Sequence, residues 1–275
     1  MPQPFDPGYV DPPFADLAAE FPGPDVYPLA DFRVEWGPIF HRGRLDGSAR
    51  VLVLGQDPGA HESAARRILV GEAGQRVQGL LAKLGIDRSY VAVNTYLYSV
   101  YGQAGGEKHA SDQAIAAYRH RWLDALLVGT GVEAAIAFGH LADRAFGTWR
   151  GTAAGAAWAG HYEHLTHPTQ PEASSHDPVK QAAAMAAMLV QYNAALPRLR
   201  EAIADPDADR PLVPYGDALT DDDHAAISAE DLPAGSPVWM RSLEEWAHRV
   251  GTDDEDKRAT LVMRVPDDLR PWHSP

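Results

Sequence analysis

The chain has 275 residues, which suits one sizeable domain with a smaller appendage. Hydrophobic residues make up 45% of it and charged residues 23%, the proportions of an ordinary globular protein. No apolar run approaches the roughly 18 residues that would span a membrane, and the first residues lack the pattern of a signal peptide. The lack of cysteine excludes disulfides, thiolate zinc sites and iron–sulfur clusters. We expect a monomeric, cytoplasmic protein without a membrane partner.

The formal net charge of −14 argues against a nucleic-acid partner, because phosphate binding needs a positive potential. The distribution of charge weakens this argument. Residues 200–275 hold 8 basic and 18 acidic side chains, whereas residues 40–150 hold 13 basic and 10 acidic ones. The simplest interpretation of the acidic tail is a solubilising surface. A sharper hypothesis is that it mimics DNA or recruits a partner.

Composition divides the chain into a proline-rich wrapping segment (1–44), a core (45–200) and an acidic C-terminal extension (201–275). In the core, short apolar runs typical of buried strands alternate with stretches of helical periodicity. We predict core strands at 50–55, 90–94, 133–138 and 162–166, and core helices at 74–84, 111–127 (with Ser111 as N-cap), 140–146 and 178–199. Outside these elements we predict helices at 14–21 and 242–250, a strand at 259–265 and a flexible glycine-rich loop at 102–106.

The alternation of strands and helices predicts an α/β fold, a three-layer α/β/α sandwich with a four-stranded, mainly parallel sheet. In such sheets functional residues collect at the carboxyl ends of the strands. Asp57 follows the first predicted strand, Asn94 ends the second and His167 follows the fourth. Each has a structural interpretation when taken singly: a helix opening, a turn residue and a loop residue. Their convergence on one edge of the sheet favours a site.

An aspartate, an asparagine and a histidine at one edge can carry out a defined chemistry. The carboxylate can hold and deprotonate a water or stabilise a cation, and the amide can read the edge of a base. The histidine can donate a hydrogen bond to an oxygen that becomes negative. Together these groups suffice to cleave an N-glycosidic bond, in which the sugar becomes cation-like and the leaving base anionic.

The motifs around these residues resemble those of the uracil-DNA glycosylase superfamily. Gly55-Gln-Asp-Pro-Gly59 resembles its motif A and His167-Pro-Thr169 its motif B. The stretch 91–100 is similar to the segment that carries the uracil-reading asparagine in the family-1 enzymes, and 69–75 resembles the helix-start segment of the thermophilic-type branch. The resemblance covers roughly residues 45–195, with the motifs in the expected order.

The resemblance implies a DNA glycosylase that removes uracil from DNA in base excision repair, without a metal or an organic cofactor. Asp57 would activate the water, and His167 would stabilise the charge on uracil O2. Gln56 would offer its backbone N–H to a uracil carbonyl, and Asn94 would read the uracil edge. The motif-B loop, from Thr169 through Gln170 and Pro171 to Ser174, would press on the DNA where the nucleotide is flipped out of the stack.

The sequence also departs from the family pattern at three places. Gly59 stands where family 1 has a tyrosine that excludes the thymine methyl group. Leu69 stands near the place of the aromatic residue that stacks on uracil. Gln170, Pro171 and Glu172 replace the usual leucine wedge of motif B. The resemblance therefore predicts the reaction type more firmly than the choice of base.

Alternatives remain open at this stage. Lys108 and His109 follow the asparagine strand where one branch carries a histidine that traps the sugar covalently, so they form a candidate DNA-contact or trapping loop. A non-catalytic uracil- or nucleic-acid-binding protein and a small-molecule glycosidase are also compatible with the motifs. A zinc site built on His161, His164 and His167 is disfavoured, because no convergent carboxylate is evident. Six basic residues are candidates for a phosphate track: Arg66, Arg67, Arg76, Lys108, Arg119 and Arg121.

Overall fold

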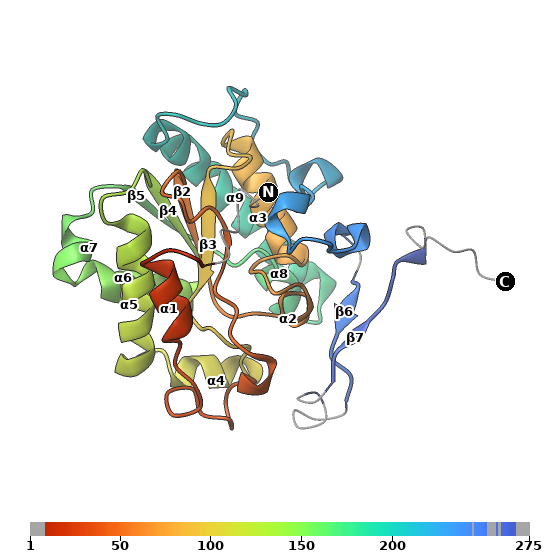
Figure 1. Ribbon diagram of the computed structural model, residues 1–275. Coiled ribbons are helices and arrows are strands. Elements are labelled where there is room, and N and C mark those ends of the chain that lie inside the picture. The colour runs from red at the N-terminus through yellow and green to blue at the C-terminus, as the bar shows by residue number, and fades with distance from the viewer. Residues whose placement is uncertain (1–8, 244, 252–256, 258–259, 268–275) are drawn as a thin grey trace.

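The computed structural model describes residues 9–243, 245–251, 257 and 260–267. Five strands form a mixed, mostly parallel sheet in the order β1-β3-β2-β4-β5 (Figure 1). Within this sheet, only β1 runs antiparallel to its neighbour. The strands are β1 (His41–Gly43), β2 (Val51–Gly55), β3 (Tyr90–Asn94), β4 (Ala134–Phe138) and β5 (His161–Leu165).

Helices cover both faces of the sheet, as the alternating side chains of its strands require. Leu52 and Leu54 point into one apolar cluster with α5 (Gln113–Leu127) and α6 (His140–Arg150). Val51 and Val53 point into a second cluster, with α3 (Glu72–Lys83) and α9 (Pro178–Ala202). The predicted α/β class, with a mainly parallel sheet between helix layers, is confirmed. The sheet has five strands rather than the predicted four, because β1 adds an antiparallel strand at its edge.

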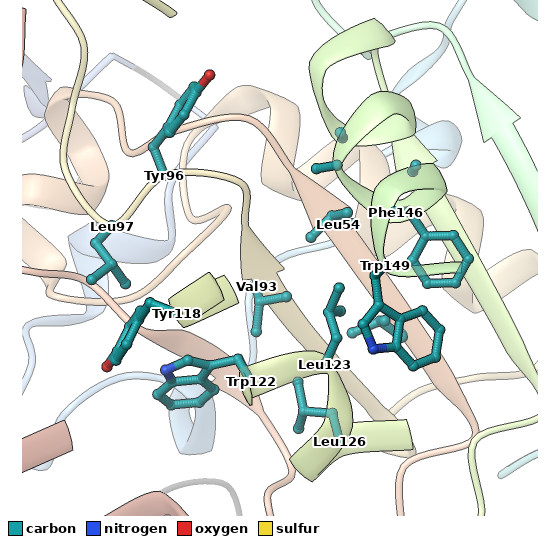
Figure 2. Close-up of a cluster of buried hydrophobic side chains, with 14 of the residues drawn as sticks. Leu54, Val93, Tyr96, Leu97, Tyr118, Trp122, Leu123, Leu126, Phe146 and Trp149 are labelled. Carbon is teal, nitrogen blue, oxygen red and sulfur yellow. The ribbon is translucent and has the colours of Figure 1, made fainter. Parts of the chain in front are cut away.

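The layer formed by α5 and α6 is built mainly from large aromatic and aliphatic side chains (Figure 2). Trp122 of α5 stacks on Phe40 with 5.7 Å between ring centroids and contacts Phe14 of α1 (Phe14–Ala19) at 5.5 Å. Trp149 of α6 is fully buried, and its indole N–H donates to Asp124 of α5 at 2.8 Å. The N-terminal segment therefore packs onto the domain through its aromatic residues, because each buries a large apolar area.

Several predicted boundaries and elements were wrong. Asp112, not Ser111, caps α5, since its carboxylate accepts from the N–H groups of residues 114 and 115. The glycine-rich segment predicted to be a flexible loop forms α4 (Gly102–Lys108). The described residues of the range 242–250 do not form the predicted helix; a short strand β6 (Ala247–His248) pairs there with β7 (Val262–Met263), which lies within the predicted strand. The remaining helical elements are α2 (Ala60–Ala65), α7 (Ala153–Ala157), α8 (Gln170–Ala173) and the 3₁₀ turns Val34–Trp36, Asp221–Asp223, Ala229–Asp231 and Val238–Arg241.

The acidic extension, which we propose to begin near residue 201, uses several of its carboxylates to bind the core. Asp231 forms an ion pair with Arg42 of β1 at 2.6 Å, and both side chains are fully buried. Asp223 pairs with Lys83 at 2.8 Å. Asp207 accepts hydrogen bonds from the N–H groups of residues 87–89. Because these carboxylates bind residues of the core, part of the extension is a structural element of the domain and not only a solubilising surface.

Among the described residues, no helix combines the length and the apolar character needed to cross a bilayer.

Candidate active site

A cavity of about 810 Å³ opens at the carboxyl ends of β2, β4 and β5. Its walls come from the loop after β2, from the residues before α3, from α4, from the start of α6 and from motif B. It unites seven of the residues singled out in the sequence: Gln56, Asp57, Gly59, Leu69, His167, Thr169 and Gln170. The two motifs, 110 residues apart at Asp57 and His167, thus face the same space.

The carboxylate of Asp57 is fixed by two hydrogen bonds. Its Oδ2 accepts from the backbone N–H of Val100 at 2.9 Å, and its Oδ1 accepts from the side-chain amide of Gln56 at 3.1 Å. Burial raises the pKa of Asp57 to about 6, although both hydrogen bonds favour the charged form. At neutral pH the group is therefore mostly ionised, yet a much better proton acceptor than an ordinary aspartate.

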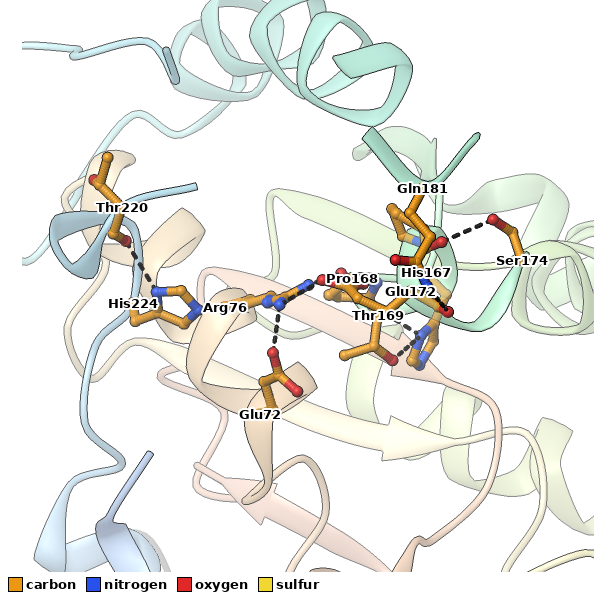
Figure 3. A network of polar contacts seen from close by, with 11 residues as sticks. Glu72, Arg76, His167, Pro168, Thr169, Glu172, Ser174, Gln181, Thr220 and His224 are labelled. Atoms are coloured by element: carbon orange, nitrogen blue, oxygen red, sulfur yellow. Dashed lines mark hydrogen bonds and ion pairs between the residues drawn. The ribbon is translucent and has the colours of Figure 1, made fainter. Parts of the chain in front are cut away.

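The imidazole of His167 is held as a neutral donor. Burial lowers its pKa, so the ring is uncharged at neutral pH. Its Nδ1 accepts from the backbone N–H of Thr169 at 3.4 Å and lies 3.3 Å from the threonine hydroxyl (Figure 3). A neutral imidazole that accepts at Nδ1 carries its proton on Nε2, so Nε2–H is available to donate.

Asn94 lies beside the cavity at the end of β3 and is not one of the residues that line it. It is 9% exposed, and its Oδ1 is buried without a donor among the described residues. Its register partner is Gly55 of β2, where a Cβ would approach Oδ1 to 2.4 Å. Only glycine at position 55 leaves room for the amide in this position.

Glu62 of α2 is a cavity residue that the sequence analysis missed. Its Oε2 accepts from the N–H of Gly59 at 3.0 Å, and its Oε1 accepts from Val70 at 2.9 Å and Gly71 at 3.2 Å. One buried carboxylate thus joins the motif-A loop to the segment that carries Leu69. The spacing of Gly59 and Glu62, three residues apart at a helix start, is the sequence signal that could have revealed it.

Leu69 adopts a left-handed backbone conformation, with φ of 55°, and lies buried in the cavity wall. This conformation is costly for a branched residue and persists only where the surroundings fix it. Gly74 approaches the Leu69 backbone so closely that a Cβ at position 74 would lie 1.6 Å from its carbonyl oxygen. The glycine and the Glu62 hydrogen bonds to the next two residues hold Leu69 in place.

The structure does not bring Lys108, His109 or Pro171 into the cavity wall. Lys108 and His109 both contact Asp31 at 2.9 Å, and the histidine side chain is only 10% exposed. Pro171 is buried within α8. The segment proposed as a DNA-contact or trapping loop is therefore turned toward the N-terminal segment.

The arginines proposed as a phosphate track are used mainly inside the protein. Arg76 donates to the carbonyl of Pro168 at 2.6 Å and pairs with Glu172 at 2.8 Å and with Glu72 (Figure 3). Arg66 donates to two carbonyls of the N-terminal segment, and Arg119 is buried. These contacts explain the acidic residue in motif B: Glu172 is neutralised by Arg76 and fixes the motif-B turn.

The histidines around β5 do not assemble into a metal centre. Within the described ranges, no three histidine or carboxylate side chains are placed to hold a metal ion. His161, expected to precede the strand, is its first residue and contacts Glu163 at 2.8 Å. His164 lines the same cavity as His167.

The fold and the candidate site define an α/β protein in which the residues of both motifs meet at the carboxyl ends of parallel strands. A comparison with models of protein families identifies the family of this chain. The model of the uracil DNA glycosylase superfamily matches residues 42–194, more than half of the chain. The chain belongs to the uracil DNA glycosylase superfamily. No curated protein matches it significantly.

Proposed function

We propose that the chain is a DNA glycosylase that hydrolyses the N-glycosidic bond of deoxyuridine in DNA. The observation that carries this proposal is that Asp57, a carboxylate with a pKa of about 6, and the neutral His167 line one cavity. Superfamily membership supports a DNA substrate and glycosylase chemistry in general. The choice of uracil rests on the resemblance of both motifs to those of uracil-excising enzymes.

In the proposed reaction the bond between C1′ of the sugar and N1 of uracil breaks, and its electron pair leaves with the base. Asp57 stabilises the cation-like sugar and accepts a proton from the attacking water, whose oxygen forms the new bond to C1′. His167 donates its Nε2–H to uracil O2, where negative charge develops. The departing uracil anion takes up a proton, so the products are free uracil and an abasic site.

We assign base recognition to the groups around this pair. The backbone N–H of Gln56 and the amide of Asn94 would bind the polar edge of uracil, because an amide offers a donor and an acceptor together. Leu69 would pack against the ring. Gly59 has no side chain to exclude a methyl group at C5, so we expect weaker discrimination against thymine than a bulky residue would give.

Hydrolysis is better supported than covalent trapping. A trapping histidine must reach C1′, whereas His109 is held by Asp31 and does not line the cavity. An SDS-stable adduct with a uracil-containing oligonucleotide, lost in His109→Ala, would favour trapping instead. A non-catalytic binding protein would retain uracil-containing DNA without releasing the base.

The test is alkali-induced cleavage of a labelled oligonucleotide that contains one uracil. We expect cleavage by the unmodified protein and a loss of 10²-fold or more in Asp57→Asn and in His167→Ala. Asp46→Asn serves as the matched control, because Asp46 is an exposed carboxylate in the segment that precedes β2. Equal activity in all four proteins would overturn the assignment of Asp57 and His167.

A further inference from the structure

A third apolar cluster joins the C-terminal extension to α2, the helix that follows motif A. β6 lies beside this helix (Figure 1). The six buried members of the cluster, of which the last four belong to the extension, are Ala65, Val70, Ile227, Leu232, Trp246 and Ala247. The family match ends at residue 194, so these four residues lie outside it. The extension thus packs directly against the segment between motif A and Leu69.

α2 has little ability to hold its own position. It is only six residues long and ends at Arg66, whose backbone is left-handed with φ of 60°. A helix this short is not stable by its own hydrogen bonds, because the first turn costs more conformational entropy than it returns. Packing against other elements must therefore fix α2. Whatever fixes α2 also fixes Gly59 and Glu62, which flank and form its first turn and line the cavity.

Trp246 provides the apolar part of this support. Its side chain is fully buried, and its ring meets the imidazole of His61 edge to face, with 4.7 Å between ring centroids. His61 directly precedes Glu62 and lies close to Gly71, where a Cβ would be 3.0 Å from Nδ1. The N–H of Gly71 donates to Glu62. Trp246 therefore contacts α2 at the point where the helix meets the cavity wall.

Arg249, which directly follows β6, provides the polar part. Its guanidinium donates to the hydroxyl of Ser63 on α2 at 3.0 Å. That hydroxyl donates in turn to the carbonyl oxygen of Gly59 at 2.9 Å. The guanidinium also donates to the carbonyl of Thr260 at 3.3 Å and lies over the ring of Trp36, 5.1 Å from its centroid. Two successive hydrogen bonds therefore connect the C-terminal extension to a glycine of motif A.

Gly59 is held at both of its backbone polar groups. Its N–H donates to Glu62 at 3.0 Å, and its carbonyl also accepts from the backbone N–H of Ser63 at 3.1 Å. Burial and the neighbouring Arg33 lower the pKa of Arg249 to about 10, so the guanidinium is charged at neutral pH. A charged donor polarises the serine hydroxyl and strengthens the hydrogen bond that this hydroxyl donates to Gly59.

We infer that Trp246 and Arg249 are positioning residues for the reaction at Asp57. They act through α2, because they hold the motif-A loop and Leu69 in the geometry in which Asp57 faces the bound base. The inference rests on the proposed uracil-excising function. It gives the extension a part in the reaction, although none of its described residues lines the cavity. A displacement of about 1 Å can slow a reaction roughly a hundredfold, so such support affects the rate directly.

The first test measures whether Arg249 acts through Ser63, from kcat and KM for uracil release from a uracil-containing oligonucleotide. Arg249→Met retains an apolar stem over Trp36 but lacks the donor. Ser63→Ala lacks the hydroxyl that reaches Gly59. We expect each variant to lower kcat about tenfold with KM changed by no more than about twofold, and the double variant to be no slower than Ser63→Ala.

Arg249→Lys keeps a charged donor and should recover part of the loss. Arg264→Met is the matched control, because Arg264 is an exposed arginine just beyond β7, and it should change neither kcat nor KM. Additive losses in the double variant, or an unchanged kcat in Arg249→Met, would overturn the inference.

Trp246 is tested against a second buried tryptophan. Trp246→Leu removes the ring that contacts His61, whereas Trp149→Leu removes a ring from the cluster around α5 and α6 together with its hydrogen bond to Asp124. We expect Trp246→Leu to lower kcat about tenfold at a temperature where the protein is folded, and Trp246→Phe to recover most of it. Trp149→Leu should lower Tm at least as much and leave kcat unchanged. Equal effects of the two leucine variants on kcat would show that Trp246 only stabilises the fold.

Hydrogen exchange separates the inference from the proposed function, because it does not depend on activity. The three amides that donate to Glu62 should exchange faster in Arg249→Met than in the unmodified protein, while those of β2 to β5 should not change. Faster exchange in a chain that releases no uracil would refute the proposed function and retain the support of motif A by the extension. Uracil release with unchanged exchange at these amides, or faster exchange with unchanged kcat, would retain the function and refute the inference.

Discussion

The backbone N–H of Val100 donates a hydrogen bond to the carboxylate of Asp57 at 2.9 Å, which joins motif A to the loop that follows β3. This contact orients the carboxylate in a cavity where burial has already raised its pKa.

The pKa of Asp57 predicts how the reaction depends on pH. Only the ionised carboxylate can accept a proton from water, so kcat should rise tenfold per pH unit below about 6 and level off above it. His167, whose pKa is lowered by burial, stays neutral over the plateau. A single-turnover pH profile checks this; a midpoint near 4 would show that Asp57 is not desolvated during the reaction.

Asp57→Asn should stabilise the protein while it removes activity. A folded-state pKa of about 6 instead of 3.8 makes the ionised group cost up to roughly 3 kcal/mol at neutral pH. Since the folded state binds the proton more tightly, stability is greatest below the unfolded pKa and falls as pH rises toward 6. Thermal unfolding should therefore give a Tm several degrees above that of the unmodified protein at pH 7.5, and little difference at pH 4. A lower Tm at pH 7.5 would contradict the assigned cost.

Glu62→Ala should impair the reaction without removing a reacting group. Three backbone N–H groups lose their acceptor, and the motif-A loop and Leu69 lose their common support. We expect kcat to fall tenfold to a hundredfold. Glu62→Gln retains an oxygen for Val70 and Gly71 but not for Gly59, so it should recover part of the loss. Both variants should retain a pH midpoint set by Asp57, moved to lower pH because the negative charge of Glu62 helps to raise the pKa of Asp57; loss of the pH dependence would indicate that Glu62 itself exchanges the proton.

Asp231→Ala should destabilise the whole domain, although it lies outside the family match. It leaves the buried guanidinium of Arg42 without its ion-pair partner, a change that costs about 3–5 kcal/mol. The double variant Arg42→Met with Asp231→Leu removes both charges and should recover most of this loss. Denaturant unfolding measures both variants. If Asp231→Ala leaves the midpoint of denaturant unfolding unchanged, the contact between the extension and β1 does not stabilise the domain.

The central strands could be predicted from the sequence because each is a continuous run of apolar residues. The predicted bounds of β3, residues 90–94, are confirmed, and β2 begins one residue later than expected. Local pattern could not predict β1, since His41, Arg42 and Gly43 carry no apolar signal. The position of Arg42 is set by Asp231, which follows 189 residues later. A contact at such a separation leaves no periodicity to detect.

Within the candidate site, too, some features could be predicted from the sequence and others could not. Motifs A and B were predictable because each is contiguous and ends a strand, so the topology of the sheet brings them together. The spacing of Gly59 and Glu62 could have indicated the contact between them, but not the contacts of Glu62 with Val70 and Gly71, which lie eight and nine residues further on. The arginines were misjudged because charge in the sequence does not reveal that Arg76 binds the carbonyl of Pro168 inside the protein.

The most direct test of the central claim is mass-spectrometric detection of free uracil in a single turnover on a uracil-containing single strand, comparing the unmodified protein with Asp57→Asn. We predict one equivalent of uracil from the unmodified protein at pH 7.5 and at least a hundredfold slower release from the variant. Release at the same rate from both proteins, or none from either, would contradict the assignment of Asp57 as the group that activates water for uracil excision.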